Sequence, residues 1–180
     1  MTPEMVEYYR AMLLVGIRDQ FDAAFDLALE TEEPLSDLIL SLSTCISDDN
    51  QVLSVLREYT LNYTIDEHTV RDLVLKDLRG RLQAGEMTRA DVVGMLYRIV
   101  QNLDKIWEDP WIDCWDISHD LELYEDGFIS EEVFIESFDA WWNEGKRLNV
   151  WELQRKWSKQ NNPTTKIGFW KRLWNKFKKS

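Results

Sequence analysis

The spacing of apolar residues is the feature that most restricts the fold of this chain. From Pro3 to about Glu30 they recur with a period near 3.6, as they do on one face of an α-helix. Alternation of apolar and polar residues, which would predict β-strands, nowhere continues beyond four or five residues. The pattern therefore predicts an all-α protein, either an irregular or a HEAT-like helical bundle.

The breaks between helices carry residues that start or stop helices. Thr2-Pro3-Glu4 supplies a capping hydroxyl, a first-turn proline and an acidic residue, and Gly16 is where the first helix would bend or divide. Thr64-x-x-Glu67 has the form of a capping box, and Asp109-Pro110 that of a cap followed by proline. We expect about eight helices, the later ones at residues 35–46, 48–59, 66–82, 89–107, 110–124, 131–144 and 149–159.

Two segments 42 residues apart, 85–92 and 127–134, resemble each other. Each begins with glycine and continues with an apolar residue, a hydroxyl residue and an acidic helix start. The spacing falls within the ~40–47 residues of HEAT-type helical pairs. A two-copy repeat and a common helix-turn-helix connection both explain this similarity.

The charge of the chain separates an acidic body from a basic tail. The 180 residues carry a formal net charge of −12, yet residues 161–180 contain only basic charges. We expect an acidic all-helical domain at residues 1–160 that repels nucleic acid and suits a basic protein partner. Cys45 and Cys114 are 69 positions apart and form no metal or disulfide pattern, as in a cytoplasmic protein with reduced thiols. We expect no signal peptide and no membrane-spanning segment.

The acidic residues concentrate between residues 104 and 140, where thirteen of them accompany one basic residue, Lys105. Asp109, Asp113, Asp116 and Asp120 recur at helical spacing, which predicts one acidic face on the helix expected after Pro110. Trp111 and Trp115 lie on another sector of the same helix. A docking surface, a solvated acidic face with both tryptophans in the core, and a divalent-metal site are the open interpretations. The docking interpretation assigns as partner-binding residues Asp109, Trp111, Asp113, Trp115, Asp116, Asp120, Glu122, Glu125 and Asp126.

Motifs for chemistry are sparse. Residues 126–132 resemble the second half of a calcium loop but lack its acidic ligand at the last position, so Ser130 is expected to cap a helix instead. His119 lies among Asp113, Asp116 and Asp120, which leaves a metal-dependent enzyme as a minor alternative. The chain is therefore expected to be non-enzymatic, with no catalytic residue, metal or cofactor.

The tail predicts a basic amphipathic helix. Its membrane-binding or docking residues are Phe169, Trp170, Lys171, Arg172, Leu173, Trp174, Lys176 and Phe177. The segment 166–180 resembles the C-terminal membrane-targeting helices of bacterial division-site proteins. Binding to an anionic membrane surface and docking onto the acidic body are both open, as is binding to nucleic acid or to a helix-binding protein.

The segment 110–130, PWIDCWDISHDLELYEDGFIS, is similar to segments of acidic all-helical immunity proteins of bacterial contact-dependent inhibition and related polymorphic-toxin systems. That resemblance implies a cytoplasmic inhibitor that neutralises a basic toxin domain, often a nuclease. The basic tail is no part of that pattern. The alternative function is a peripheral membrane adaptor, held at the inner face of the membrane by its tail.

Overall fold

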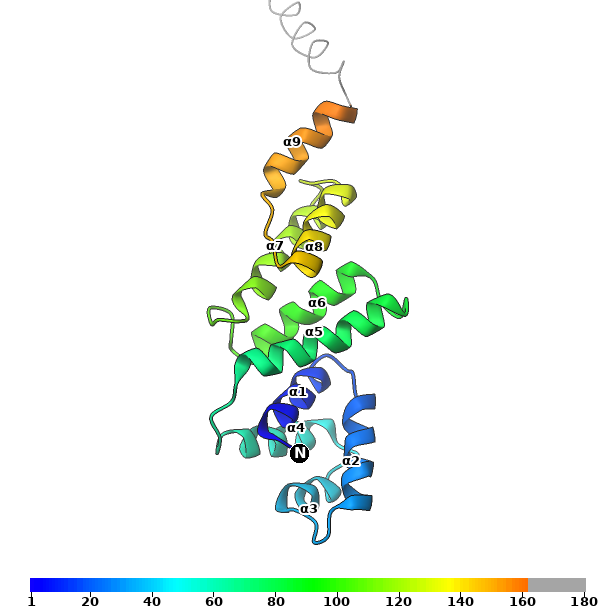
Figure 1. The fold of residues 1–180 in the computed structure, drawn as a ribbon, viewed down its shortest axis with the longest axis vertical. Helices are drawn as coiled ribbons and strands as arrows, with labels where there is room; N and C mark the ends of the chain where they lie inside the picture. The colour runs from blue at the N-terminus through cyan, green and yellow to red at the C-terminus, as the bar shows by residue number, and fades with distance from the viewer. Residues whose placement is uncertain (162–180) are drawn as a thin grey trace, which may run out of the picture. The chain divides into compact units, whose positions relative to one another are not determined.

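The computed structural model describes residues 1–161, and all the regular elements in this range are α-helices (Figure 1). The predicted all-helical bundle is confirmed. The described part of the chain forms nine helices: α1 (Pro3–Leu13), α2 (Asp19–Thr31), α3 (Asp37–Ser43), α4 (Asp49–Thr60), α5 (Glu67–Gln83), α6 (Arg89–Asn102), α7 (Ile112–Glu125), α8 (Glu131–Glu144) and α9 (Val150–Asn161). The chain divides into two compact units, Met1–Ser118 and His119–Ser180, at a boundary within α7 that nothing in the sequence pattern predicts.

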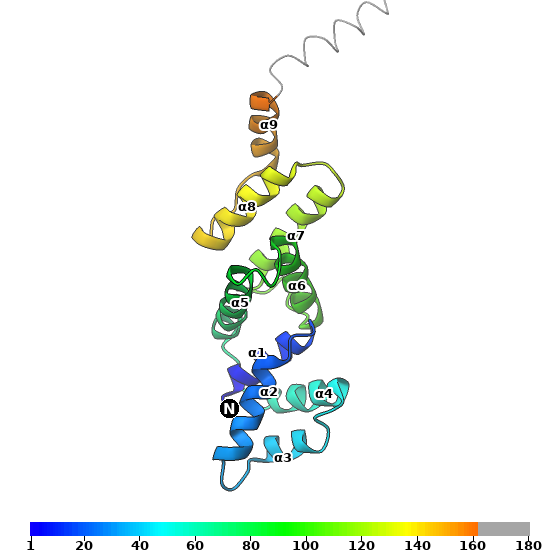
Figure 2. The same cartoon turned by 90° about the vertical axis from the view of Figure 1, so that its right-hand side faces the viewer.

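Helix α1 is the centre of the first unit. It packs most extensively against α4 and α5, and Figures 1 and 2 both show it lying between them. Val6 and Ala11 are completely buried, because the apolar face of α1 is covered on both sides. The Tyr8 hydroxyl donates a 3.2 Å hydrogen bond to Asp77 of α5, which fixes the two helices to each other.

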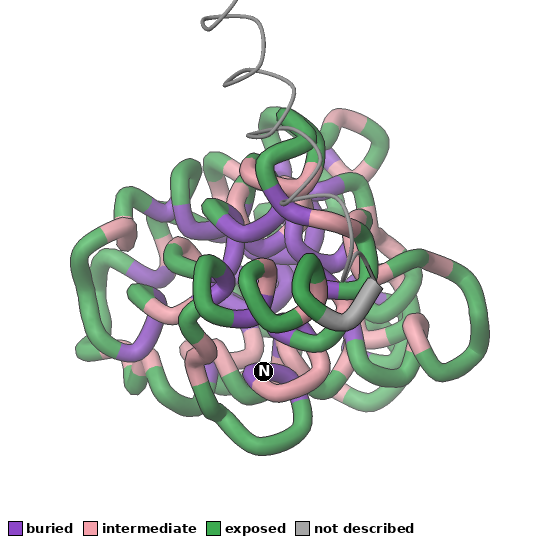
Figure 3. The backbone as a smooth tube through the Cα atoms, turned by 90° about the horizontal axis from the view of Figure 1, so that it is seen from above, coloured by how far each residue is buried: buried purple, intermediate pink, exposed green. Residues whose placement is uncertain are grey.

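In helix α5 the apolar residues that recur at helical spacing form the buried face of the helix. Val70, Val74 and Leu78 are four positions apart along the helix and have no exposed surface. Burial of each such side chain contributes about 1.5–3 kcal/mol relative to exposure. The tube in Figure 3 alternates between buried and exposed residues along the helices, as amphipathic helices require.

Several helix ends follow the predicted capping residues, whereas those predicted at Thr64 and Asp109 do not. Gly16 has a φ of +83° and separates α1 from α2, so the predicted division of the first helix is confirmed. Thr88 and Asp91 form a capping box at the start of α6. The capping box predicted at Thr64 and Glu67 is wrong, because Asp66 caps α5 by accepting a 3.1 Å hydrogen bond from the His68 amide.

The two similar segments of the sequence form the same type of turn. Gly85 and Gly127 have φ values of +73° and +74°, and in each case the next amide bonds to a carbonyl five residues back. The same arrangement ends α1 at Gly16. It is thus a recurrent helix terminus in this chain, and by itself it does not establish a repeat.

The second unit has an aromatic core on α8. Phe138 and Trp142 stack with centroids 5.3 Å apart, and Tyr124 of α7 stacks on Phe134 at 5.5 Å. Helix α9 packs against α8, and the Trp157 indole donates a 3.0 Å hydrogen bond to Glu136. In the part of the chain that the structure describes, no helix is both long and apolar enough to cross a bilayer.

Candidate protein-docking surface

The connection between α6 and α7, residues 103–111, is not helical, although the sequence predicted helices up to Trp107 and again from Pro110. Asp104 has a φ of +58°, and the Lys105 amide bonds to the Val100 carbonyl at 2.9 Å, which ends α6 at Asn102. Helix α7 starts at Ile112 rather than at Pro110. This change places Trp107 in an irregular segment at the surface.

Polar contacts with α5 hold this connection in place. Lys105 lies 3.4 Å from Glu67 and 2.7 Å from Glu108, and the hydrogen bond with Glu108 raises the pKa of Lys105 above its usual value. Asp109, predicted as a helix cap, instead pairs with His68 of α5 at 3.3 Å. Further along the connection, the Pro110 carbonyl accepts a 3.3 Å hydrogen bond from Arg71.

Three aromatic side chains meet beside the connection, and we call them the aromatic ladder: Tyr97, Trp107 and Trp115. Trp115 stacks on Tyr97 of α6 with centroids 5.2 Å apart and an interplanar angle of 21°. Trp107 lies 6.2 Å from Trp115 and is 77% exposed, whereas the other two rings are half-buried. Trp107 thus lies next to the Trp115 ring, which is itself stacked on Tyr97, and exposes most of its surface to solvent.

Acidic residues accompany the ladder along the same stretch of chain. Asp104, Glu108, Asp109 and Asp116 are exposed, and Asp113 is half-buried. Lys105 is the one basic residue between positions 104 and 116, and its ammonium group is already shared by two carboxylates. The arrangement therefore combines negative potential with an exposed indole, which suits a cationic protein surface.

The expectation that Trp111 is available to a partner is wrong. It is completely buried, and its indole N–H donates a 2.8 Å hydrogen bond to Glu67. Cys114 and Ile117 of α7 are also completely buried. The helical spacing had placed Trp111 on a different sector from these two residues, but the connection before α7 directs its ring inward.

The expectation for Asp120 is also wrong. This aspartate belongs to the second unit and is only 4% exposed. It accepts hydrogen bonds from Ser137 at 2.6 Å and from Arg147 at 3.0 Å, so its charge is neutralised within the unit. A partner has no access to it.

The remaining predicted acidic residues of the second unit, Glu122, Glu125 and Asp126, are exposed. The predicted tail residues lie outside the described part of the chain. Within that part, no group of three or more histidine, cysteine, aspartate or glutamate side chains is placed to hold a metal ion. Burial raises the pKa of Cys114 to about 12, so this thiol stays protonated at neutral pH.

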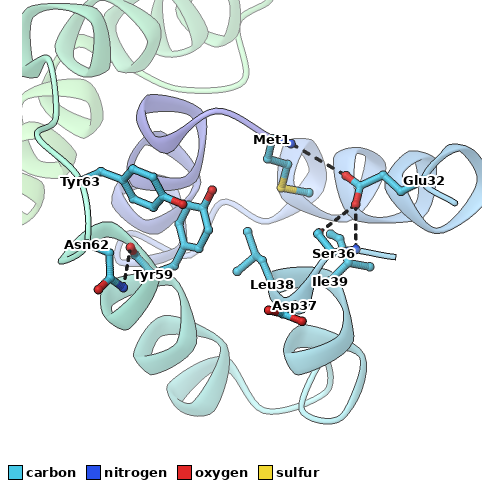
Figure 4. Close-up of a pocket in the computed structure, with 9 residues that line it drawn as sticks. All are labelled: Met1, Glu32, Ser36, Asp37, Leu38, Ile39, Tyr59, Asn62 and Tyr63. Carbon is cyan, nitrogen blue, oxygen red and sulfur yellow. Dashed lines mark hydrogen bonds and ion pairs between the residues drawn. The ribbon is translucent and has the colours of Figure 1, made fainter. Parts of the chain in front are cut away.

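A separate pocket of about 580 Å³ lies between the end of α2, the start of α3 and the end of α4 (Figure 4). Tyr59 and Tyr63 form one wall, with ring centroids 4.9 Å apart, and Leu38 and Ile39 contribute apolar surface. Glu32 accepts hydrogen bonds from the amide and hydroxyl of Ser36, which lower its pKa and keep it charged. Glu32 also lies 3.9 Å from the N-terminal ammonium group of Met1, so its charge is compensated within the pocket.

Two residues of the aromatic ladder were not predicted from the sequence as part of the docking surface. Tyr97 lies on α6, where its spacing gives no sign that it faces a tryptophan 18 positions later. Trp107 was assigned to the end of a helix, although the acidic pair Glu108 and Asp109 and the following proline indicate a break. Its position in such a break was the available signal for exposure.

We compared the chain with models of known protein families, with characterised proteins and with solved structures, and none of them matches it.

Proposed function

We propose that this protein is a non-enzymatic, cytoplasmic binding protein that neutralises a basic toxin domain, as immunity-type inhibitors do. The observation that carries the proposal is Trp107, which is 77% exposed yet supported by Trp115 and Tyr97. Tryptophan is enriched among the residues that dominate the binding energy of protein interfaces.

The charge around the ladder supports a basic partner. Asp104, Glu108 and Asp116 are exposed in the same stretch of the sequence as Trp107 and Trp115. Complementary charge increases the rate at which partners associate, while a buried indole slows their dissociation. An acidic surface of this kind fits over the cationic cleft of an enzyme that acts on nucleic acid.

The test is calorimetry of the purified full chain with the purified product of the neighbouring gene. Trp107→Ala is expected to weaken binding about 30-fold, which corresponds to about 2 kcal/mol for a central aromatic anchor. Trp151→Ala is the matched control, because Trp151 is also exposed, at 48%, but belongs to the second unit. It is expected to bind like the wild type.

Charge is tested on the same two proteins by stopped-flow measurement of the association and dissociation rates at different salt concentrations. Raising the salt from about 50 to 500 mM is expected to slow association strongly and to change dissociation little. The proposal fails if the neighbouring product is not a basic protein, or if the Trp107→Ala variant binds it as tightly as the wild type.

A further inference from the structure

Another pocket, of about 340 Å³, lies in the first unit between α1, the start of α2 and α5. Its volume falls within the range of about 300–1,000 Å³ that is usual for small-molecule sites. Each of the two long walls comes from residues three and four positions apart, which share one face of a helix. These walls are Met5, Tyr8 and Tyr9 of α1 and Leu73, Lys76 and Asp77 of α5, and we call the site the α1–α5 pocket.

The interior of the α1–α5 pocket is aromatic and aliphatic. Tyr8 and Tyr9 are only 6% and 5% exposed, and their ring centroids lie 5.1 Å apart. Met5 and Leu73 are half-buried and add aliphatic surface to the two walls. A ligand of this pocket therefore needs an apolar part, and a planar ring suits the two tyrosine rings.

One charge of the lining is compensated and the other is not. Asp77 accepts hydrogen bonds from the Tyr8 hydroxyl and from Arg81, each at 3.2 Å. Lys76 is exposed, and its ammonium group forms no ion pair with a carboxylate of residues 1–161. Gln20, also exposed, adds an amide donor from the start of α2. The pocket thus presents an available positive charge and a hydrogen-bond donor, which together suit an anion.

Gly80 leaves part of the same pocket open. It lies in the interior of α5, where glycine is about 1 kcal/mol less favourable than alanine. Its backbone is helical, and a Cβ at this position would meet no neighbouring helix within 4 Å. Neither the backbone conformation nor the packing of α5 therefore requires glycine here, whereas a side chain would take up space in the pocket.

We propose that the α1–α5 pocket binds a small organic anion, namely a carboxylate attached to an aromatic ring. The carboxylate pairs with Lys76 and accepts a hydrogen bond from Gln20, while the ring lies against Tyr9 and Leu73. Charge-assisted hydrogen bonds are roughly twice as strong as neutral ones, so the carboxylate decides which ring compounds bind. The site uses no residue of the aromatic ladder and is independent of toxin binding.

The experiment is a titration of the full chain followed by two-dimensional NMR of its backbone amides. The probe is naphthylacetate, and naphthylacetamide is its uncharged counterpart. Naphthylacetate is expected to shift the amide signals of Tyr9, Lys76 and Gly80 over one common concentration range. Naphthylacetamide is expected to bind about 10-fold more weakly, because it lacks the charge that pairs with Lys76.

Two variants test the charge and the space separately. Lys76→Gln is expected to bind naphthylacetate about 10-fold more weakly than the wild type and naphthylacetamide equally well. Gly80→Leu is expected to bind neither compound, because leucine occupies the pocket. It is also expected to resist urea at least as well as the wild type, because leucine favours a helix over glycine. Lys156→Gln removes an exposed lysine of the second unit and, as the control, is expected to bind like the wild type.

Four results would overturn the proposal. Equal binding of naphthylacetate and naphthylacetamide to the wild type would show that the site does not recognise an anion. Wild-type affinity for naphthylacetate in Lys76→Gln or in Gly80→Leu would exclude this pocket as the binding site. An unchanged Gly80 signal would do the same. Shifts confined to residues outside the lining, residues 162–180 included, would place the probe elsewhere on the chain.

Discussion

Asp120 and Arg147 form an ion pair at 3.0 Å, and the carboxylate of this pair is almost completely buried. Ser137 donates a further hydrogen bond of 2.6 Å to the same carboxylate oxygen. A buried carboxylate that loses its cation is strongly destabilising, because its desolvation is no longer offset. The contact therefore neutralises Asp120 within the second unit, and breaking it is expected to destabilise that unit.

Arg147→Met is expected to lower the free energy of unfolding by about 3 kcal/mol, because it leaves Asp120 buried and uncompensated. Urea denaturation followed by tryptophan fluorescence measures the change. The double variant Asp120→Asn/Arg147→Met is expected to be less destabilised than the single Arg147→Met variant. Equal stability of wild type and Arg147→Met would contradict the role of the pair.

Trp107 and Trp111 are four positions apart, but truncating them to alanine is expected to change the free energy of unfolding by very different amounts. Trp111→Ala removes a completely buried ring and its hydrogen bond with Glu67, so a loss of about 3–5 kcal/mol in unfolding free energy is expected. Trp107→Ala removes a ring that is 77% exposed, and a change below about 0.5 kcal/mol is expected. Parallel urea titrations compare the two, and similar losses would refute the burial assigned to them.

Tyr59 is expected to ionise at a higher pH than an ordinary tyrosine. Its hydrogen bond with Tyr63, assisted by burial, raises its pKa from 10 to about 12. Because the folded pKa exceeds the unfolded one, the stabilisation is complete below pH 10 and is lost between pH 10 and 12. Tyr63→Phe should move the Tyr59 titration, followed by phenolate absorbance, back toward pH 10. An unchanged titration in Tyr63→Phe would exclude Tyr63 as the cause.

Neither cysteine is expected to react in the folded protein. Cys45 and Cys114 are both buried, and the pKa of Cys114 is raised to about 12 by burial. Thiolate, the reactive form, is therefore scarce at pH 8. A colourimetric thiol reagent should label both residues in urea and neither in buffer. Rapid labelling of native Cys114 would instead contradict its burial and its raised pKa.

Most helices were predictable from local sequence, whereas which of their side chains are exposed was not. Gly16, Thr88 and the buried series Val70, Val74 and Leu78 follow from capping, backbone freedom and helical period, all of which act within a few residues. Those same rules place residues on a face of a helix but do not say which face is covered.

The residues that were misjudged are governed by distant partners. The buried Trp111 donates a hydrogen bond to Glu67, 44 positions earlier. The buried Asp120 accepts one from Arg147, 27 positions later. No spacing rule within one helix contains such contacts. Tertiary structure therefore divides the predicted aspartate series: Asp109 and Asp116 are exposed, Asp113 is half-buried, and Asp120 is buried in an ion pair.

Glu67 receives hydrogen bonds or ion-pair contacts from both Trp111 and Lys105, which bracket Trp107 in sequence. The connection is therefore preorganised, and its conformational entropy is lost when the protein folds rather than when a partner arrives. Affinity at Trp107 thus depends on a glutamate of another helix. Replacing Glu67 would weaken association through the greater freedom of the connection, even where the partner never touches that carboxylate.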